Sequence, residues 1–193
     1  RRAACSACLL APLLALAAAL PAAVPLVPQA PAAVEREVTI LYTNDVHSAI
    51  DPIPAYWLPG TPKLGGADRL ATLVRRERAA AKTSFLFDTG DVFTGTLSFL
   101  SRGEALMEMM RIFGYDAMAI GNHEFDYGSD NFEIWMNEVS FPVLGANIYH
   151  RGSKHRYARP HAILERDGLR VGVDGVIGLD ARSVVLPMFV DNR

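Results

Sequence analysis

Cysteine is nearly absent from this 193-residue sequence, and the part predicted to fold has none. The two cysteines, Cys5 and Cys8, lie in an N-terminal stretch made mostly of Ala, Leu, Pro and Val. The rest of the chain therefore forms no disulfide, even in a compartment that would permit one. Cys8 precedes the apolar run, whereas a lipid-attachment cysteine would follow it, so the pattern does not favour a lipoprotein.

A long unbroken apolar run is also missing, because the N-terminal stretch is interrupted by Pro12, Pro21, Pro25 and Pro28. A membrane-spanning helix of ~20 residues fits it poorly. Arg1 and Arg2, the apolar residues 8–20 and the Ala-Pro-Ala sequence at 30–32 are instead typical of a signal peptide, which we predict over residues 1–33. This predicts export to the periplasm or the extracellular space, with no stable membrane span after cleavage. An uncleaved N-terminal anchor is the alternative.

The sequence likewise lacks an excess of either charge. It has 19 basic and 21 acidic residues, and without Arg1 and Arg2 the basic count is 17, for a formal charge of −4. This balance does not suggest a nucleic-acid-binding protein. The hydrophobic share of 50% indicates a globular chain, and the length of 193 residues suits one domain, or one domain plus an appendage. One basic cluster is predicted to be a solvated loop: Arg151, Lys154, His155, Arg156 and Arg159.

No internal repeat is present, and the part after residue 33 alternates between two hydrophobic periods. Period-two or short apolar runs predict strands, and apolar residues spaced i, i+3, i+4 and i+7 predict helices. This alternation indicates a layered α/β fold. Strands are expected at 38–42, 84–87, 116–120 and 141–148, a hairpin turn at Asp167-Gly168 between 162–165 and 169–173, a further strand at 176–179, and helices at 67–81, 106–113 and 129–139.

Polar clusters follow three of the predicted strands. They are Asp45 with His47, Asp91, and Asn122 with His123. Each cluster alone is typical of an ordinary turn. Ligands of open α/β sheets bind beyond the carboxyl ends of the strands, so we expect the three clusters to converge on one edge. Together they predict a metal site of mixed oxygen and nitrogen ligands, which does not select among Zn, Mn, Mg, Co and Fe.

The same motifs resemble a known family. The segments 40–48, 88–91 and 115–126, with Gly65-Gly66 and 141–148, are similar to the secreted 5′-nucleotidases and UDP-sugar hydrolases of the calcineurin-like metallophosphoesterases. The resemblance covers about residues 38–179. It implies that residues 34–193 are the N-terminal part of a layered metallophosphoesterase sandwich, an incomplete domain without the family's C-terminal nucleotide-binding domain.

The resemblance also implies roles for individual residues. Asp45 and His47 would bind the first of two divalent metal ions, Asn122 the second, and Asp91 would bridge both. Two metals ~3.5–4 Å apart activate a water and clamp the reacting phosphoryl group. His123, paired with Asp126, would stabilise the transition state. Two neighbouring carboxylates are given no ligand role: Asp88, expected in a structural turn, and Glu124.

This sequence departs from the family pattern in two respects. The histidines that complete the family's metal site, in later Gly-His and Gly-His-x-His segments, do not occur before Arg193, and His150, His155 and His161 lie in the wrong context. We therefore expect a fragment with little or no activity by itself. Asp174 also replaces an apolar residue of an expected buried strand, where an unpaired carboxylate is costly, so either the chain turns there or the stretch contains a sequence error.

The leading functional hypothesis is a metal-dependent enzyme that hydrolyses phosphate monoesters of nucleotides, with a small-molecule nucleotide as its partner. Within the enzyme class, the alternatives are a 2′,3′-cyclic phosphodiesterase and a UDP-sugar hydrolase. Outside it, the alternative is a secreted remnant or binding module that keeps the fold without catalysis. The pattern leaves the substrate-binding residues and the oligomeric state undetermined.

Overall fold

The central element is a parallel sheet of four strands in the order β1-β4-β5-β6. The computed structural model describes residues 35–181, and residues 36–181 belong to one compact unit. Each strand pairs in parallel with the next, from Thr39 beside Ser84 to Ala119 beside Leu144. The predicted α/β architecture is therefore confirmed. The strands are β1 (Thr39–Thr43), β4 (Ser84–Asp88), β5 (Ala117–Ala119) and β6 (Val143–Leu144).

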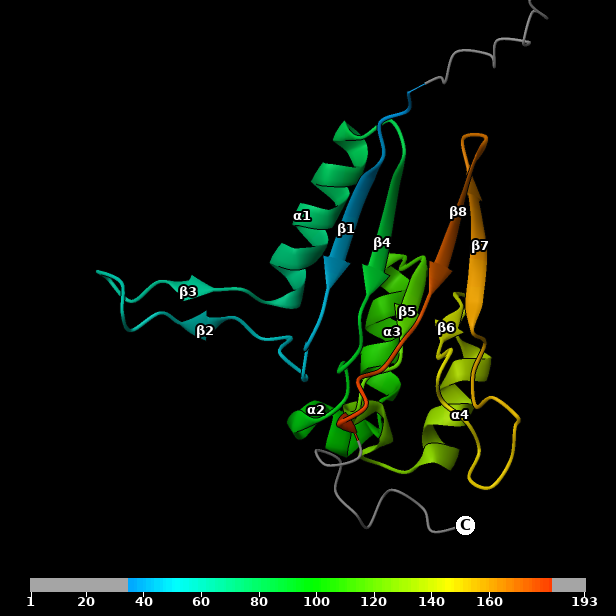
Figure 1. The fold of residues 1–193 in the computed structure, drawn as a ribbon. Coiled ribbons are helices and arrows are strands. Elements are labelled where there is room, and N and C mark those ends of the chain that lie inside the picture. The colour runs from blue at the N-terminus through cyan, green and yellow to red at the C-terminus, as the bar shows by residue number, and fades with distance from the viewer. Residues whose placement is uncertain (1–34, 182–193) are drawn as a thin grey trace, which may run out of the picture. The chain divides into compact units, whose positions relative to one another are not determined.

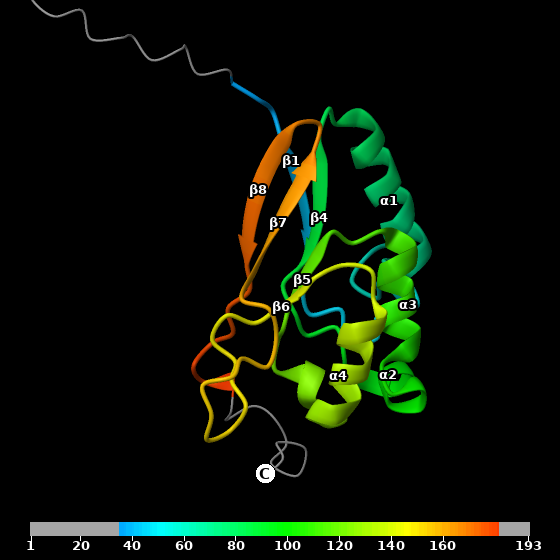
Figure 2. The same ribbon diagram turned by 90° about the vertical axis from the view of Figure 1, so that its right-hand side faces the viewer.

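The helices cover one face of this sheet, as Figures 1 and 2 show. They are α1 (Ala67–Ala80), α2 (Gly95–Ser101), α3 (Glu104–Phe113) and α4 (Ser129–Glu138). Helix α3 ends at Gly114, whose φ of 70° is the left-handed conformation expected there. Among the described residues, no helix has the length and apolar character needed to cross a membrane.

The core lies between these helices and the sheet. Leu86 and Met118 contribute from the strands, and Leu106 and Met110 from α3. Phe132 of α4 is fully buried in the same cluster. The apolar stripes predicted from helical spacing are thus core packing, which anchors the sheet whose strand ends carry the polar clusters.

A hairpin of β7 (His161–Arg166) and β8 (Leu169–Asp174) lies on the side of the sheet opposite the helices (Figure 2). Its turn is the predicted pair Asp167-Gly168, with φ values of 51° and 70°. Arg166 ties the hairpin to the sheet, because its guanidinium lies 4.9 Å from the ring centroid of Phe85 and 2.6 Å from Asp116 Oδ1.

Asp116 joins three parts of the fold. Its Oδ2 accepts hydrogen bonds from Arg78 of α1 at 2.9 Å and from the Leu86 amide of β4 at 2.8 Å. Its other oxygen binds Arg166 of the hairpin. The helix, the sheet and the hairpin therefore meet at one carboxylate.

Asp174 does not occupy a buried strand position, and of the two explanations offered above the structure favours the one in which the chain leaves the strand at this point. Asp174 is the last residue of β8 and its side chain is exposed, so it incurs no burial cost. The chain leaves the strand at Gly175, which is buried and whose carbonyl accepts the Ala146 amide at 2.6 Å. A side chain at Gly175 would meet Leu144 O at 2.4 Å, so a residue without Cβ is needed there.

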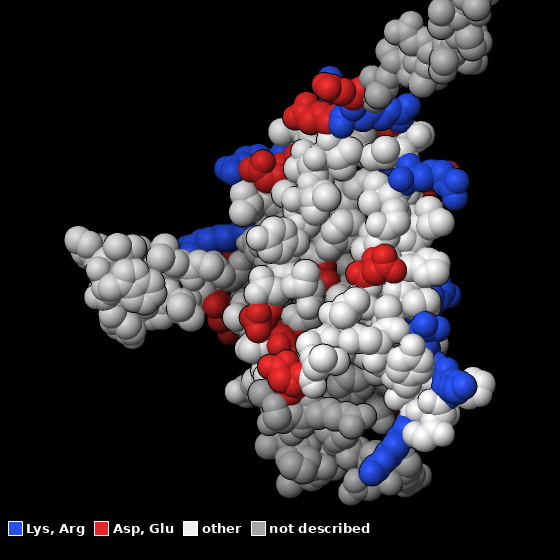
Figure 3. All heavy atoms as spheres, viewed as in Figure 1, with Lys and Arg blue, Asp and Glu red and all other residues white. Residues whose placement is uncertain are grey.

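Two other strand predictions differ from the structure. Residues 176–179 form no strand, and the expected strand at 141–148 is shortened to β6 because Gly145 and Ala146 instead bond to Arg159 and Gly175. The loop after β1 contains a small hairpin, β2 (Ile53–Pro54) and β3 (Lys63–Leu64), whose projecting surface is mostly uncharged in Figure 3. The basic cluster is exposed as predicted. The predicted signal peptide lies outside the described residues.

Candidate metal centre

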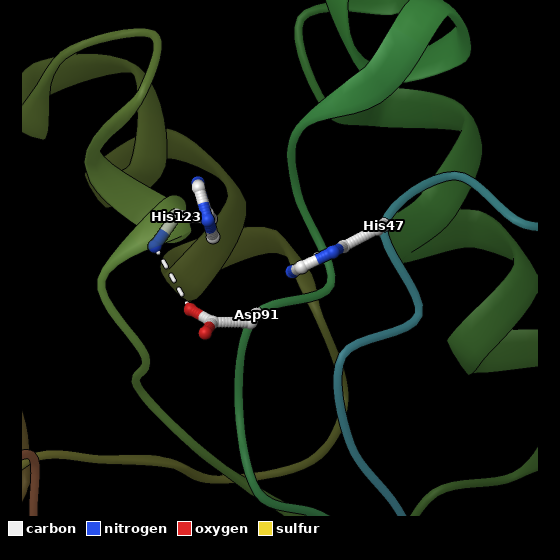
Figure 4. Close-up of side chains that lie close together, drawn as sticks. All are labelled: His47, Asp91 and His123. Atoms are coloured by element: carbon white, nitrogen blue, oxygen red, sulfur yellow. Dashed lines mark hydrogen bonds between the residues drawn. The ribbon is translucent and has the colours of Figure 1, made fainter. Parts of the chain in front are cut away.

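The turns after β1, β4 and β5 bring three side chains together. His47, Asp91 and His123 each offer one ligand atom, and these atoms lie within 4.8 Å of one another (Figure 4). Each residue follows a strand that neighbours the next in the parallel sheet. The convergence expected from the strand order is therefore present. Figure 3 shows acidic side chains gathered over this end of the sheet, a charge distribution that favours cations.

Three of the predicted ligands adopt backbone conformations that are rare outside glycine. Asp45, His47 and Asp91 have φ values of 51°, 45° and 60°. Such left-handed residues cost about 1–3 kcal/mol each and cluster at functional sites. Backbone hydrogen bonds hold them: Asp45 N–H donates to Gly90 O at 3.1 Å, and His47 N–H donates to Asp91 O at 3.3 Å. The first and second ligand turns are thus fastened to each other.

Two glycines allow the second and third turns to touch. A Cβ on Gly90, whose φ is 103°, would lie 2.5 Å from Gly121 N. A Cβ on Gly121 would lie 2.3 Å from Asp91 Oδ1. Only residues without side chains fit this contact, so the predicted Gly-Asp and Gly-Asn pairs serve to bring their polar neighbours close together.

The surroundings of His47 fit a bound cation. Its Nε2 atom is buried and has no hydrogen-bond partner. Leaving such an atom unsatisfied costs about 1–3 kcal/mol. Asp45 Oδ1 lies 3.6 Å from it, and the His123 ring is 4.8 Å away in an edge-on arrangement. A metal ion between these groups would satisfy the nitrogen and offset the carboxylate charge.

In Figure 4 the Asp91 carboxylate lies below the two imidazole rings, on the side of His123. Its Oδ1 accepts the His123 amide at 2.9 Å, which fixes the carboxylate next to the third turn. Asn122 lines an open cavity together with Asp91 and His123, so the predicted amide ligand faces the same space. Asp45 is the outermost of the predicted ligands, with 56% of its side chain exposed.

The structure also brings His123 and Asp126 together. His123 Nδ1 lies 2.8 Å from Asp126 Oδ2, and Asp126 is buried. Because a carboxylate accepts, Nδ1 carries the hydrogen, and the carboxylate fixes the orientation of the ring. Both residues belong to the short helical turn η1 (His123–Phe125) and its end, a local geometry that brings positions i and i+3 into contact.

Two further carboxylates are buried beneath the site. Asp88, which is 2% exposed, accepts hydrogen bonds from Thr43 Oγ1 at 2.5 Å and from the Gly90 amide at 2.8 Å, the turn role predicted for it. Burial raises the pKa of Asp88 to about 7. Burial also raises the pKa of Glu124 above its ordinary value, although backbone donors oppose this. Sequence reasoning gave Glu124 no structural role.

Residues 38–172 match the family model of the calcineurin-like phosphoesterases, and the chain belongs to this family. It is 39% identical over 159 residues to the 5′-nucleotidase of Mus musculus, a match that covers 78% of this chain and 28% of that protein. The family and fold that the motifs predicted are thereby confirmed.

Solved structures of similar proteins support the same fold. The 5′-nucleotidase precursor of Thermus thermophilus has a TM-score of 0.69 and 35% identity, covering 78% of this chain and 31% of that one. The NAD nucleotidase of Haemophilus influenzae has a TM-score of 0.65 and 28% identity, covering 74% and 26%. The chain thus spans between a quarter and a third of the length of these three proteins.

Proposed function

We propose that this chain supplies metal ligands to a phosphoesterase site that hydrolyses phosphate monoesters of nucleotides. The supporting observation is that His47, Asp91 and His123 lie close together and that the buried Nε2 atom of His47 has no hydrogen-bond partner. Family membership supports the reaction class.

Four side chains would hold two divalent metals. Asp45 and His47 would bind the first, Asn122 the second, and Asp91 both. The metals, when bound, supply a water of lowered pKa and polarise the phosphoryl group. The left-handed conformations of Asp45, His47 and Asp91 hold these three ligands in place before any metal arrives, which limits the reorganisation that binding requires.

His123 would act on the substrate through Nε2, because Nδ1 is engaged by Asp126. In this role the imidazole donates a hydrogen bond to a phosphoryl oxygen as negative charge develops. Asp126 keeps the ring oriented through its contact with Nδ1. The pair therefore performs the electrostatic part of the reaction, separate from the metals.

The nucleotide substrate is inferred from the relatives, which include 5′-nucleotidases and an NAD nucleotidase. Cyclic nucleotides and nucleotide sugars are the competing substrates. The predicted signal peptide supports export, so the substrate would be met in the periplasm or outside the cell.

The test uses the full-length protein encoded by the gene, supplied with Mn²⁺ or Zn²⁺. We expect phosphate release from AMP, with slower turnover of 2′,3′-cyclic AMP and UDP-glucose. Asp91→Asn should abolish AMP hydrolysis, whereas Asp130→Asn, the same change at an exposed position of α4, should not. Faster hydrolysis of the cyclic ester would refute the monoesterase, and no hydrolysis of any ester would favour the non-catalytic alternative.

A further inference from the structure

Glu124 is next to His123 in the chain, and its side chain is fully buried. Its carboxylate accepts hydrogen bonds from four backbone amides. Its Oε1 atom accepts the amides of Val92 at 2.8 Å and Phe93 at 3.3 Å. Its Oε2 atom accepts the amides of Asp91 at 3.0 Å and Gly121 at 2.7 Å. Both oxygens are thus occupied by main-chain donors.

These four donors belong to two different ligand turns. Three of them follow β4, in the segment that begins with Asp91, and the fourth is Gly121, directly before Asn122. A single side chain therefore fastens the backbone that carries the predicted bridging ligand to the backbone that carries the second-metal ligand. The contact also keeps Gly121 against Asp91, where no side chain would fit.

The donor set matches an ionised carboxylate. Four N–H groups converge on two oxygens, and a carboxylate is the side chain that can accept at both without presenting a hydrogen of its own. An amide of the same size would direct an NH₂ group at two N–H donors in either orientation. The link between the two turns thus depends on the two acceptor oxygens of Glu124 as well as on the size of its side chain.

We infer that Glu124 is a positioning residue that sets the metal affinity of the site by holding Asp91 and Asn122 in a fixed position relative to each other. Asp91 is left-handed, a conformation that a non-glycine residue keeps only when its surroundings enforce it. The Glu124 bond to the Asp91 amide supplies that enforcement directly. The inference rests on the proposed function, because it concerns the same metal site.

The experiment compares Glu124→Gln with wild type in the full-length protein. Co²⁺ affinity is measured by calorimetry, and the ligand geometry by the visible absorption of bound Co²⁺. Loss of a partner that orients a metal ligand typically lowers affinity by about 10–100-fold, and we expect a loss in this range with an altered spectrum. Glu108→Gln, at an exposed glutamate of α3 that pairs with Arg111, is the matched control and should behave as wild type.

A purely structural role for Glu124 would lower stability without changing the metal site. The folded fraction is therefore measured by circular dichroism under the titration conditions. Wild-type affinity and spectrum in folded Glu124→Gln would overturn the inference, as would a loss explained entirely by unfolded protein. If Glu124→Gln does not fold, Glu124→Asp replaces it: reduced affinity supports the inference, and unchanged affinity overturns it.

AMP hydrolysis separates this inference from the proposed function. Wild type that binds Co²⁺ with an affinity that depends on Glu124 but releases no phosphate from any ester would contradict the proposed function and leave the positioning role intact. Wild type that hydrolyses AMP, beside a Glu124→Gln variant with unchanged affinity and kcat, would contradict the positioning role alone.

Discussion

Gly121 lies so close to Asp91 that a methyl group on Gly121 would stand 2.3 Å from the Oδ1 atom of Asp91. Gly121→Ala should therefore displace the carboxylate and lower the free energy of unfolding by about 1–3 kcal/mol, the usual cost of overpacking. Urea unfolding measures the stability, and calorimetry measures the accompanying loss of metal affinity.

The control for this variant is Gly172→Ala. Gly172 lies in β8, has no positive φ, and has no atom within 4 Å of the added Cβ. We expect its stability and metal affinity to match wild type. If Gly121→Ala and Gly172→Ala had the same stability and metal affinity, the backbone around Asp91 would be able to move and accommodate the added methyl group.

Asp88 predicts a pH dependence of stability. Burial raises its pKa from 3.8 to about 7, so the folded state holds the proton more tightly than the unfolded state. The contribution of Asp88 is fully present below about pH 4 and is lost as the pH rises through about 7. In metal-free protein, the free energy of unfolding of Asp88→Asn should rise by about 2–3 kcal/mol relative to that of wild type between pH 5 and pH 8. Urea unfolding at both pH values measures this difference. If the unfolding free energies of the two proteins changed equally between these pH values, the pKa of Asp88 would not be raised.

His47 should affect metal binding more than the stability of the metal-free fold. Its buried Nε2 has no partner, so His47→Asn removes an unsatisfied group, and asparagine tolerates the left-handed backbone. Metal at 100 times its Kd stabilises a folded protein by about 2.7 kcal/mol. Thermal unfolding with Mn²⁺ and with chelator should show this gain in wild type and in exposed His155→Asn, but not in His47→Asn. A retained gain would remove His47 from the ligand set.

Asp116 should be important for stability away from the metal site. Asp116→Ala leaves Arg78 and Arg166 without their shared carboxylate and the Leu86 amide without its acceptor. Breaking a largely buried pair costs roughly 3 kcal/mol or more, which urea unfolding can measure. Glu108→Ala, at an exposed ion pair, should leave stability close to wild type. A small loss for Asp116→Ala would mean that the hairpin and α1 are held by packing alone.

The sequence predicted the features that depend on local pattern. Short apolar runs located β1, β4 and β5, and the rule that parallel strands end at one edge was enough to bring His47, Asp91 and His123 together. The sequence left two explanations for Asp174 open, and the period-two alternation of β8 accounts for its position. This alternation directs Leu169, Val171 and Val173 inward and Asp174 outward.

Features that depend on distant backbone were not predictable in the same way. The partners of Glu124 at Asp91, Val92 and Phe93 lie 31–33 residues earlier in the chain, and no spacing rule connects a side chain to remote amides. The left-handed state of His47 is equally hidden, because it is imposed by the Asp91 carbonyl of a neighbouring turn. The roles of the ligands stay predictions until the experiments above are made.

The strand order β1-β4-β5-β6 follows the order of the chain, and this bears on how the protein assembles. A polypeptide that emerges N-terminus first can add each strand to the edge of the previous one, without opening a sheet that has already formed. The residues of the site arrive in the same succession, with Asp45 and His47 first, then Asp91, and then Asn122 and His123. Synthesis from the N-terminus therefore presents the residues of this site in the order in which the strands that carry them can join the sheet.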